Sequence, residues 1–151
     1  MVDELFAQME ELMRETFEGG KPGEGTQYLD HDSGIRTTLK GMTAEQASRR
    51  VGDHPSIAGH VRHMSYHMRA ACAWIAGDHG KLDWKGSFLP HAVTVDEWNA
   101  LIRQLEEERT AFLRFMKALP PEKLVAEGAG MGSIAHLAYH LGAIRQLLPA
   151  D

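Results

Sequence analysis

Two histidines near the end of the chain, His136 and His140, have the residue type and the spacing that a metal site needs. On a helix, residues four apart lie about 40° apart around the axis and about 6 Å along it, so both imidazoles share one face. Such a pair can bind one metal ion. A pair by itself is a weak signal, because short motifs also occur by chance.

A second histidine group, earlier in the chain, strengthens the signal. His60, His63 and His67 fall within about 60° of the circumference of one helix, and the stretch His63-Met-Ser-Tyr-His67 parallels His136-Leu-Ala-Tyr-His140. Two helices that face each other with such stripes bring three or more imidazoles to one point, which is how helix bundles build metal sites. The sequence therefore predicts a metal centre between two helices.

The elements that must position these histidines are four long helices. Apolar residues at three- and four-residue steps predict them, together with N-cap residues at their starts and glycine or proline at their ends. Ser56 and Ser133 are the expected caps of the two histidine helices, and Thr94-Val-Asp-Glu97 is a capping box. The predicted helices are Val2–Glu18, 57–76, 95–119 and 133–148.

No segment has the alternating pattern of a β-strand, so we predict an all-α protein, a four-helix bundle that forms one domain over residues 1–151. The connection between the first and second long helices, residues 19–55, is too long for a hairpin. It carries two short predicted helices, Ile35–Leu39 and one that the Thr43-Ala-Glu-Gln46 capping box opens. We expect this connection to cross an end or a side of the bundle, where it can cover the metal site.

Composition excludes several classes of function. The formal net charge of −5, without a Lys/Arg cluster, argues against nucleic acid as a partner. No apolar stretch reaches the roughly 18 residues that a membrane span requires. The acidic N-terminal stretch lacks the pattern of a signal peptide, and the single cysteine, Cys72, suits a reducing compartment. We therefore expect a cytoplasmic protein, and a homodimer through a helix face is compatible with a small bundle.

Several short motifs together give the chain a family resemblance. The stretch from about His31 to Leu148 resembles the DinB/YfiT-like family of metal-dependent four-helix bundles. The stretches that carry the resemblance are His31-Asp-Ser-Gly-Ile35, Gly41-Met-Thr43-Ala-Glu45-Gln46-Ala47, Ser56-Ile57 ahead of His63, and His136-x-x-Tyr139-His140-x-Gly142-x-Ile144. The chain departs from the family pattern at Ala143, where glutamine is usual, and at Ala58, where an aromatic residue is common.

The resemblance implies a ligand set and a chemistry. It implies that His63, His136 and His140 bind a divalent ion, zinc or nickel, with water at the remaining positions. His67 and His60 are extra to the family pattern, so a fourth imidazole, with His67 as the candidate, can replace one water. Three imidazoles with open positions suit catalysis, whereas four protein ligands suit a structural site. The expected function is a metal-dependent enzyme acting on a small molecule, either a hydrolase or a low-molecular-weight thiol S-transferase. The alternative is a non-catalytic bundle that binds metal or dimerises.

Other residues near these motifs give weaker indications. Glu127, Asp53 and His31 lie in loops that can supply an acid or base, and Tyr66 and Tyr139 flank the predicted ligands. Cys72 falls about 180° from His63 on the same helix, so we expect a small buried apolar residue rather than a nucleophile. The remaining histidines, His54, His79 and His91, lie in polar loops and are expected to face solvent.

Overall fold

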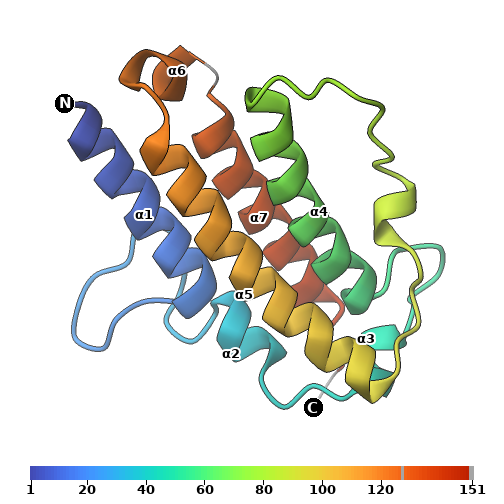
Figure 1. Ribbon diagram of the computed structural model, residues 1–151. Coiled ribbons are helices and arrows are strands. Elements are labelled where there is room, and N and C mark those ends of the chain that lie inside the picture. The colour runs from blue at the N-terminus through green and yellow to red at the C-terminus, as the bar shows by residue number, and fades with distance from the viewer. Residues whose placement is uncertain (127, 150–151) are drawn as a thin grey trace.

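The computed structural model describes residues 1–126 and 128–149 and confirms the all-α fold. Its four long helices are α1 (Val2–Glu18), α4 (Ile57–Ile75), α5 (Val95–Ala118) and α7 (Ala129–Gln146). The shorter elements are α2 (Ile35–Leu39), α3 (Ala44–Ser48), the 3₁₀ turn η1 (Gly86–Phe88) and α6 (Pro121–Ala126). The long helices lie side by side in a bundle (Figure 1).

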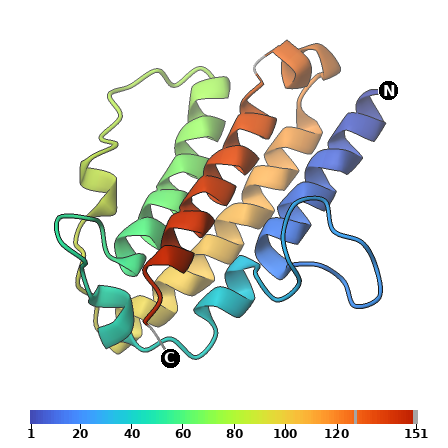
Figure 2. The same cartoon turned by 180° about the vertical axis from the view of Figure 1, so that it is seen from behind.

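The order of the helices in the bundle differs from their order in the chain. Helices α1 and α7 run in one direction, and α4 and α5 run in the other (Figures 1 and 2). Helix α4 packs against α5 and α7, and α7 also packs against α1. The two histidine-bearing helices, α4 and α7, are therefore antiparallel neighbours, as a shared metal site requires.

The predicted start signals of α4 and α5 are confirmed. The Ser56 hydroxyl accepts a hydrogen bond from the Gly59 backbone N–H, and the Thr94 and Glu97 side chains form a complete capping box. The Pro120-Pro121 pair ends α5, and Pro121 then begins α6. Proline is favoured at a first helical position because that residue needs no backbone N–H.

The predicted cap of the last helix is wrong. Helix α7 begins at Ala129, after Gly128 in a left-handed conformation, so Ser133 lies inside the helix and is buried. The glycine-rich stretch 128–132 has low intrinsic helix propensity, but tertiary packing overrides it. A Cβ at Gly130 would collide with the Met9 side chain, so glycine lets α7 approach α1 closely at this point.

The two long connections lie on different parts of the bundle, and the first crosses an end of it, as expected. The connection 19–55 is fastened to α1 by Glu15, whose carboxylate accepts the backbone N–H groups of residues 27–29. It then passes, with α2 and α3, along one end of the bundle (Figure 2). The connection 76–94 instead runs back along α4, and η1 packs against that helix. It is this second connection that covers the histidine cluster.

The core contains apolar residues from all four long helices, including Met13, Met64, Phe112 and Leu137. None of the helices in the described part of the chain combines the length and the apolar character that crossing a membrane demands.

Candidate metal centre

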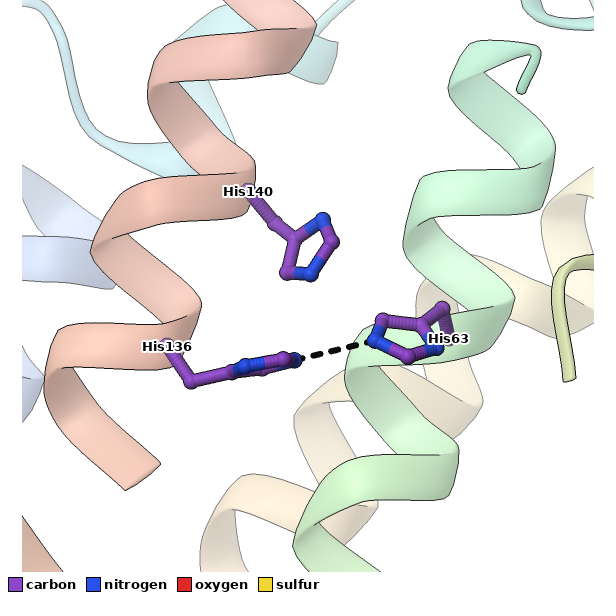
Figure 3. Close-up of side chains that lie close together, drawn as sticks. All are labelled: His63, His136 and His140. Carbon is purple, nitrogen blue, oxygen red and sulfur yellow. Dashed lines mark hydrogen bonds between the residues drawn. The ribbon is translucent and has the colours of Figure 1, made fainter. Parts of the chain in front are cut away.

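The structure brings His63, His136 and His140 together. His63 projects from α4 towards His136 and His140, which project from α7 (Figure 3). One ring nitrogen from each side chain lies within 4.8 Å of the other two. His63 and His140 are buried, and His136 is partly exposed. The two stripes predicted from helical spacing therefore meet at the interface of α4 and α7.

A serine from the second connection fixes the tautomer of His63. The Ser87 hydroxyl donates to the Trp84 carbonyl oxygen at 2.6 Å, and it lies 2.7 Å from His63 Nδ1. Because a hydroxyl has one proton and the carbonyl can only accept, His63 Nδ1 must donate to Ser87. The neutral His63 ring then carries its lone pair on Nε2. That nitrogen lies 3.0 Å from His136 Nε2, where the lone pair can bind a metal.

His140 makes a second histidine contact within the cluster. Its Nδ1 lies 2.9 Å from Nδ1 of His60, which is buried at the N-terminal end of α4. This bond uses Nδ1 and leaves Nε2 of His140 for the group of three. His60 therefore contacts His140 at Nδ1, the ring nitrogen of His140 that does not belong to the group of three.

His67 has a different role from the three clustered residues. Its ring stacks on His136, with centroids 3.8 Å apart and planes 12° from parallel, and its Nε2 lies 3.2 Å from the Ser133 hydroxyl. The structure does not bring His67 into the group of three. The stacked ring instead fixes the position of His136.

Aromatic residues of the second connection cover one side of the cluster. The Phe88 ring lies parallel to His63 with centroids 4.0 Å apart, and Trp84 lies near both His63 and His67. A Cβ at Gly59 would approach the Phe88 carbonyl oxygen to 2.9 Å, so glycine on α4 permits η1 to approach this closely. These rings exclude water from His63.

Burial keeps the cluster neutral. Desolvation, with repulsion from neighbouring histidines, lowers the pKa of His60, His63 and His67 to about 4. Burial lowers the pKa of His140 even more strongly, and it lowers that of His136 as well. Neutral imidazoles are the form that binds metal, so the cluster needs to lose no protons at pH 7 in order to act as a ligand set.

The residues fit a transition-metal ion. Two nitrogens that each lie 2.0–2.1 Å from one tetrahedral zinc ion are separated by about 3.3–3.4 Å, so the 3.0 Å between His63 Nε2 and His136 Nε2 would have to widen by a few tenths of an ångström to admit the ion. The donor set is entirely imidazole, which suits zinc, nickel, copper or iron rather than magnesium or calcium. A hydrogen-bonded second ring nitrogen, as in His63, is typical of metal-binding histidines.

Comparison with known proteins agrees with this site. A model of the DinB superfamily matches residues 27–144, which is most of the chain. The chain belongs to the DinB superfamily. Searches of curated proteins and of solved structures found no match. The matched region of this DinB-superfamily chain contains the three candidate ligands, the neighbouring His60 and His67, and the connection 76–94 that covers them.

The other residues singled out from the sequence are distributed as follows. Glu127 lies outside the described residues. His31 packs beside Gly20, in the connection after α1, and Asp53 uses its carbonyl to accept from Arg50, so neither contacts the cluster. Tyr66 accepts the backbone N–H of residue 83, whereas Tyr139 is 75% exposed and meets the His140 ring edge-on.

Two further predictions concern residues away from the candidate ligands. Cys72 is partly buried against the core, and burial raises the pKa of its thiol to about 11, so it is a poor nucleophile as expected. His91 was expected to face solvent, but its Nδ1 is buried where the second connection crosses α4.

Sequence reasoning missed the residues that support the candidate ligands. Ser87 and Phe88 contact His63, and both lie in a segment without periodicity. The signal that could have pointed to the segment is Gly59, since a glycine inside a helix often marks a close approach of another segment.

Proposed function

We propose that this DinB-superfamily protein binds one divalent transition-metal ion through His63, His136 and His140, and that it is a metal-dependent enzyme acting on a small molecule. Zinc and nickel are the proposed ions, and the proposed reactions are hydrolysis or S-transfer with a low-molecular-weight thiol. Family membership and the three-histidine cluster support metal binding.

The observation that carries the proposal is the hydrogen bonding of His63. Ser87 holds its Nδ1 proton, so the Nε2 lone pair faces His136 inside a buried cluster. A single hydrogen-bond partner at Nε2 would satisfy a buried histidine that serves only for packing, whereas here ring nitrogens of both His136 and His140 lie within 4.8 Å of a ring nitrogen of His63. The arrangement of two neutral rings with converging nitrogens is that of a ligand set.

Three ligands favour catalysis over a closed structural site. The polar contacts of His67 and His60 are made to Ser133 and His140, which supports a set of three with open positions. When bound, an ion of this kind supplies Lewis-acid chemistry that polarises a carbonyl or lowers the pKa of a water or thiol. On one side of the proposed site, the Phe88 ring excludes water from His63. On another side, the exposed Tyr139 ring lies beside His140.

Burial of the cluster favours the second candidate, a non-catalytic metal-binding bundle. His63 and His140 are 5% and 4% exposed, as in sites that bind metal for stability. The two functions differ in what loss of the metal does to the fold. A structural ion contributes to folding outright, whereas a catalytic ion is held by a fold that is stable without it.

The first experiment is metal analysis of the protein purified without a histidine tag. We expect about one zinc or nickel ion per chain, and His63→Ala should lose it while its metal-free melting temperature stays close to that of the wild type. His79→Ala, which removes an exposed histidine outside the cluster, is the control and should retain the ion. Wild-type protein without metal, even after incubation with zinc, would refute the proposal. Unfolding of His63→Ala would favour the structural candidate.

The thiol reaction, the homodimer and the cytoplasmic location remain proposals with their own tests. A thiol substrate should change the visible spectrum of the cobalt-substituted protein when glutathione or cysteine is added. Light scattering gives the oligomeric state, and cell fractionation gives the location.

A further inference from the structure

A cavity lies directly beside two of the clustered histidines. It has a volume of about 430 Å³, and His60, His140 and the edge of Phe88 form one end of it. This volume is within the range of small-molecule sites. Its apolar walls include Pro55 and Leu147, and no described residue that lines it carries a carboxylate, ammonium or guanidinium group. A cation would find no negative countercharge here, so the cavity disfavours a positively charged molecule.

The contact between His60 and His140 links this cavity to the metal site. Their Nδ1 atoms are 2.9 Å apart, so one of the two nitrogens donates and the other accepts. An imidazole that binds a metal through Nε2 keeps its proton on Nδ1. His140 must then be the donor and His60 Nδ1 the acceptor, which places the proton of the neutral His60 ring on Nε2.

The other side of the His60 ring is available for a ligand. Its hydrogen bond within the described part of the chain is the one at Nδ1, and its ring lines the cavity. His60 Nε2 is not one of the fully buried polar atoms that lack a partner in the described part of the chain, so a ligand oxygen would replace water as the acceptor of its proton. The same ring thus supports His140 on one side and offers an N–H group on the other.

We propose that His60 positions His140 for metal binding and donates its Nε2–H to an oxygen of the substrate, and that the substrate carries no positive charge and has an apolar body and a carbonyl-type oxygen. This inference rests on the proposed metal site. It adds His60 to the residues of that site and narrows the class of substrate.

The positioning role is tested by zinc affinity, measured by competition with a chelating dye. His60→Ala should bind zinc about 10- to 100-fold more weakly, the loss typical of removing a partner of a metal ligand. His60→Asn can place an oxygen close to the position of Nδ1 and should retain most of the affinity. Metal-free unfolding of both variants in urea identifies any general loss of stability. Wild-type zinc affinity in His60→Ala, or equal losses in the two variants, would overturn the positioning role.

The donor role and the substrate class are tested with benzamide on the zinc-loaded protein, by ligand-observed NMR. Benzamide should bind more tightly than benzylamine, which has the same ring but a positive charge. His60→Asn should weaken benzamide binding about tenfold, the loss of one hydrogen bond. Ala143→Leu should also weaken it by filling the cavity, whereas Ala71→Leu, beside a separate cavity on α4, should not.

The outcomes separate this inference from the proposed function. Absence of benzamide binding, or binding that His60→Asn and Ala143→Leu leave unchanged, would overturn the assignment of donor and substrate class while zinc binding still stands. A wild-type chain that binds no zinc would refute the proposed function, and this inference with it.

Discussion

Replacing Ser87 by alanine tests the geometry of the metal site without touching a candidate ligand. In the structure, Ser87 accepts the Nδ1 proton of His63 and donates to the Trp84 carbonyl, so it fixes which nitrogen of His63 faces His136. In Ser87→Ala the His63 ring loses this support. It can then change its tautomer or rotate, and both changes move the lone pair away from His136.

The expected loss follows from the type of contact removed. Loss of a hydrogen-bond partner of a metal-binding histidine lowers metal affinity by about 10- to 100-fold, which corresponds to about 1.4–2.7 kcal/mol. Some of this loss arises from a weakened η1 turn, because the bond to the Trp84 carbonyl disappears as well. The 3.0 Å distance between His63 and His136 should also become less well defined.

The assay is zinc competition with a chelating dye, together with urea unfolding of the metal-free protein. Ser133→Ala is the matched control. It removes a buried serine hydroxyl that contacts His67, which is not one of the three candidate ligands. We expect Ser133→Ala to keep zinc affinity near that of the wild type. If Ser87→Ala bound zinc as tightly as the wild type, or if Ser133→Ala lost more affinity, the assignment of His63 as the supported ligand would be wrong.

Three further predictions concern stability. In the metal-free protein, the free energy of unfolding should fall as pH is lowered from 6.5 to about 4. In this range the unfolded chain takes up protons on His60, His63 and His67, whose pKa there is near 6.5. In the folded chain burial lowers their pKa to about 4, so they stay neutral. The slope is up to about 1.4 kcal/mol per pH unit for each histidine, and a flat profile in urea titrations would contradict it. Glu15→Gln should lower the free energy of unfolding by about 1–3 kcal/mol, since both oxygens of the buried Glu15 carboxylate accept from the backbone N–H groups of residues 27–29, whereas glutamine offers one neutral acceptor oxygen. Hydrogen exchange at these amides should become faster, and unchanged exchange would argue against this anchor. Gly34→Ala should lower the free energy of unfolding by about 1–3 kcal/mol, because the new Cβ would collide with the backbone at the end of α1. Gly132→Ala, which has open space around it in α7, should be neutral or should stabilise the protein by up to about 1 kcal/mol. Equal shifts of the melting temperature for the two variants would refute the close contact between α1 and the start of α2.

Local patterns in the sequence were enough to predict three of the four long helices at both ends, and the faces of α4 and α7 on which the histidines lie. Val2–Glu18 and α4 begin and end at or near the predicted residues because caps, glycines and helical spacing act over a few residues. The same spacing placed His136 and His140 on one stripe of α7 and His63 on a stripe of α4. These are local properties, and tertiary packing did not change them.

Tertiary structure alone decided what surrounds the histidines. The second connection lies against α4 through contacts far apart in sequence, and only there do Ser87 and Phe88 meet His63. In the same way, α7 begins four residues before Ser133, which is buried where its hydroxyl meets His67 of α4. Helical periodicity specifies the direction of a side chain relative to its own axis, but the partner that it meets depends on how separate segments pack. The ligand stripes could therefore be predicted from the sequence, whereas the tautomer of His63, the contact between His60 and His140, and the cavity beside them could not.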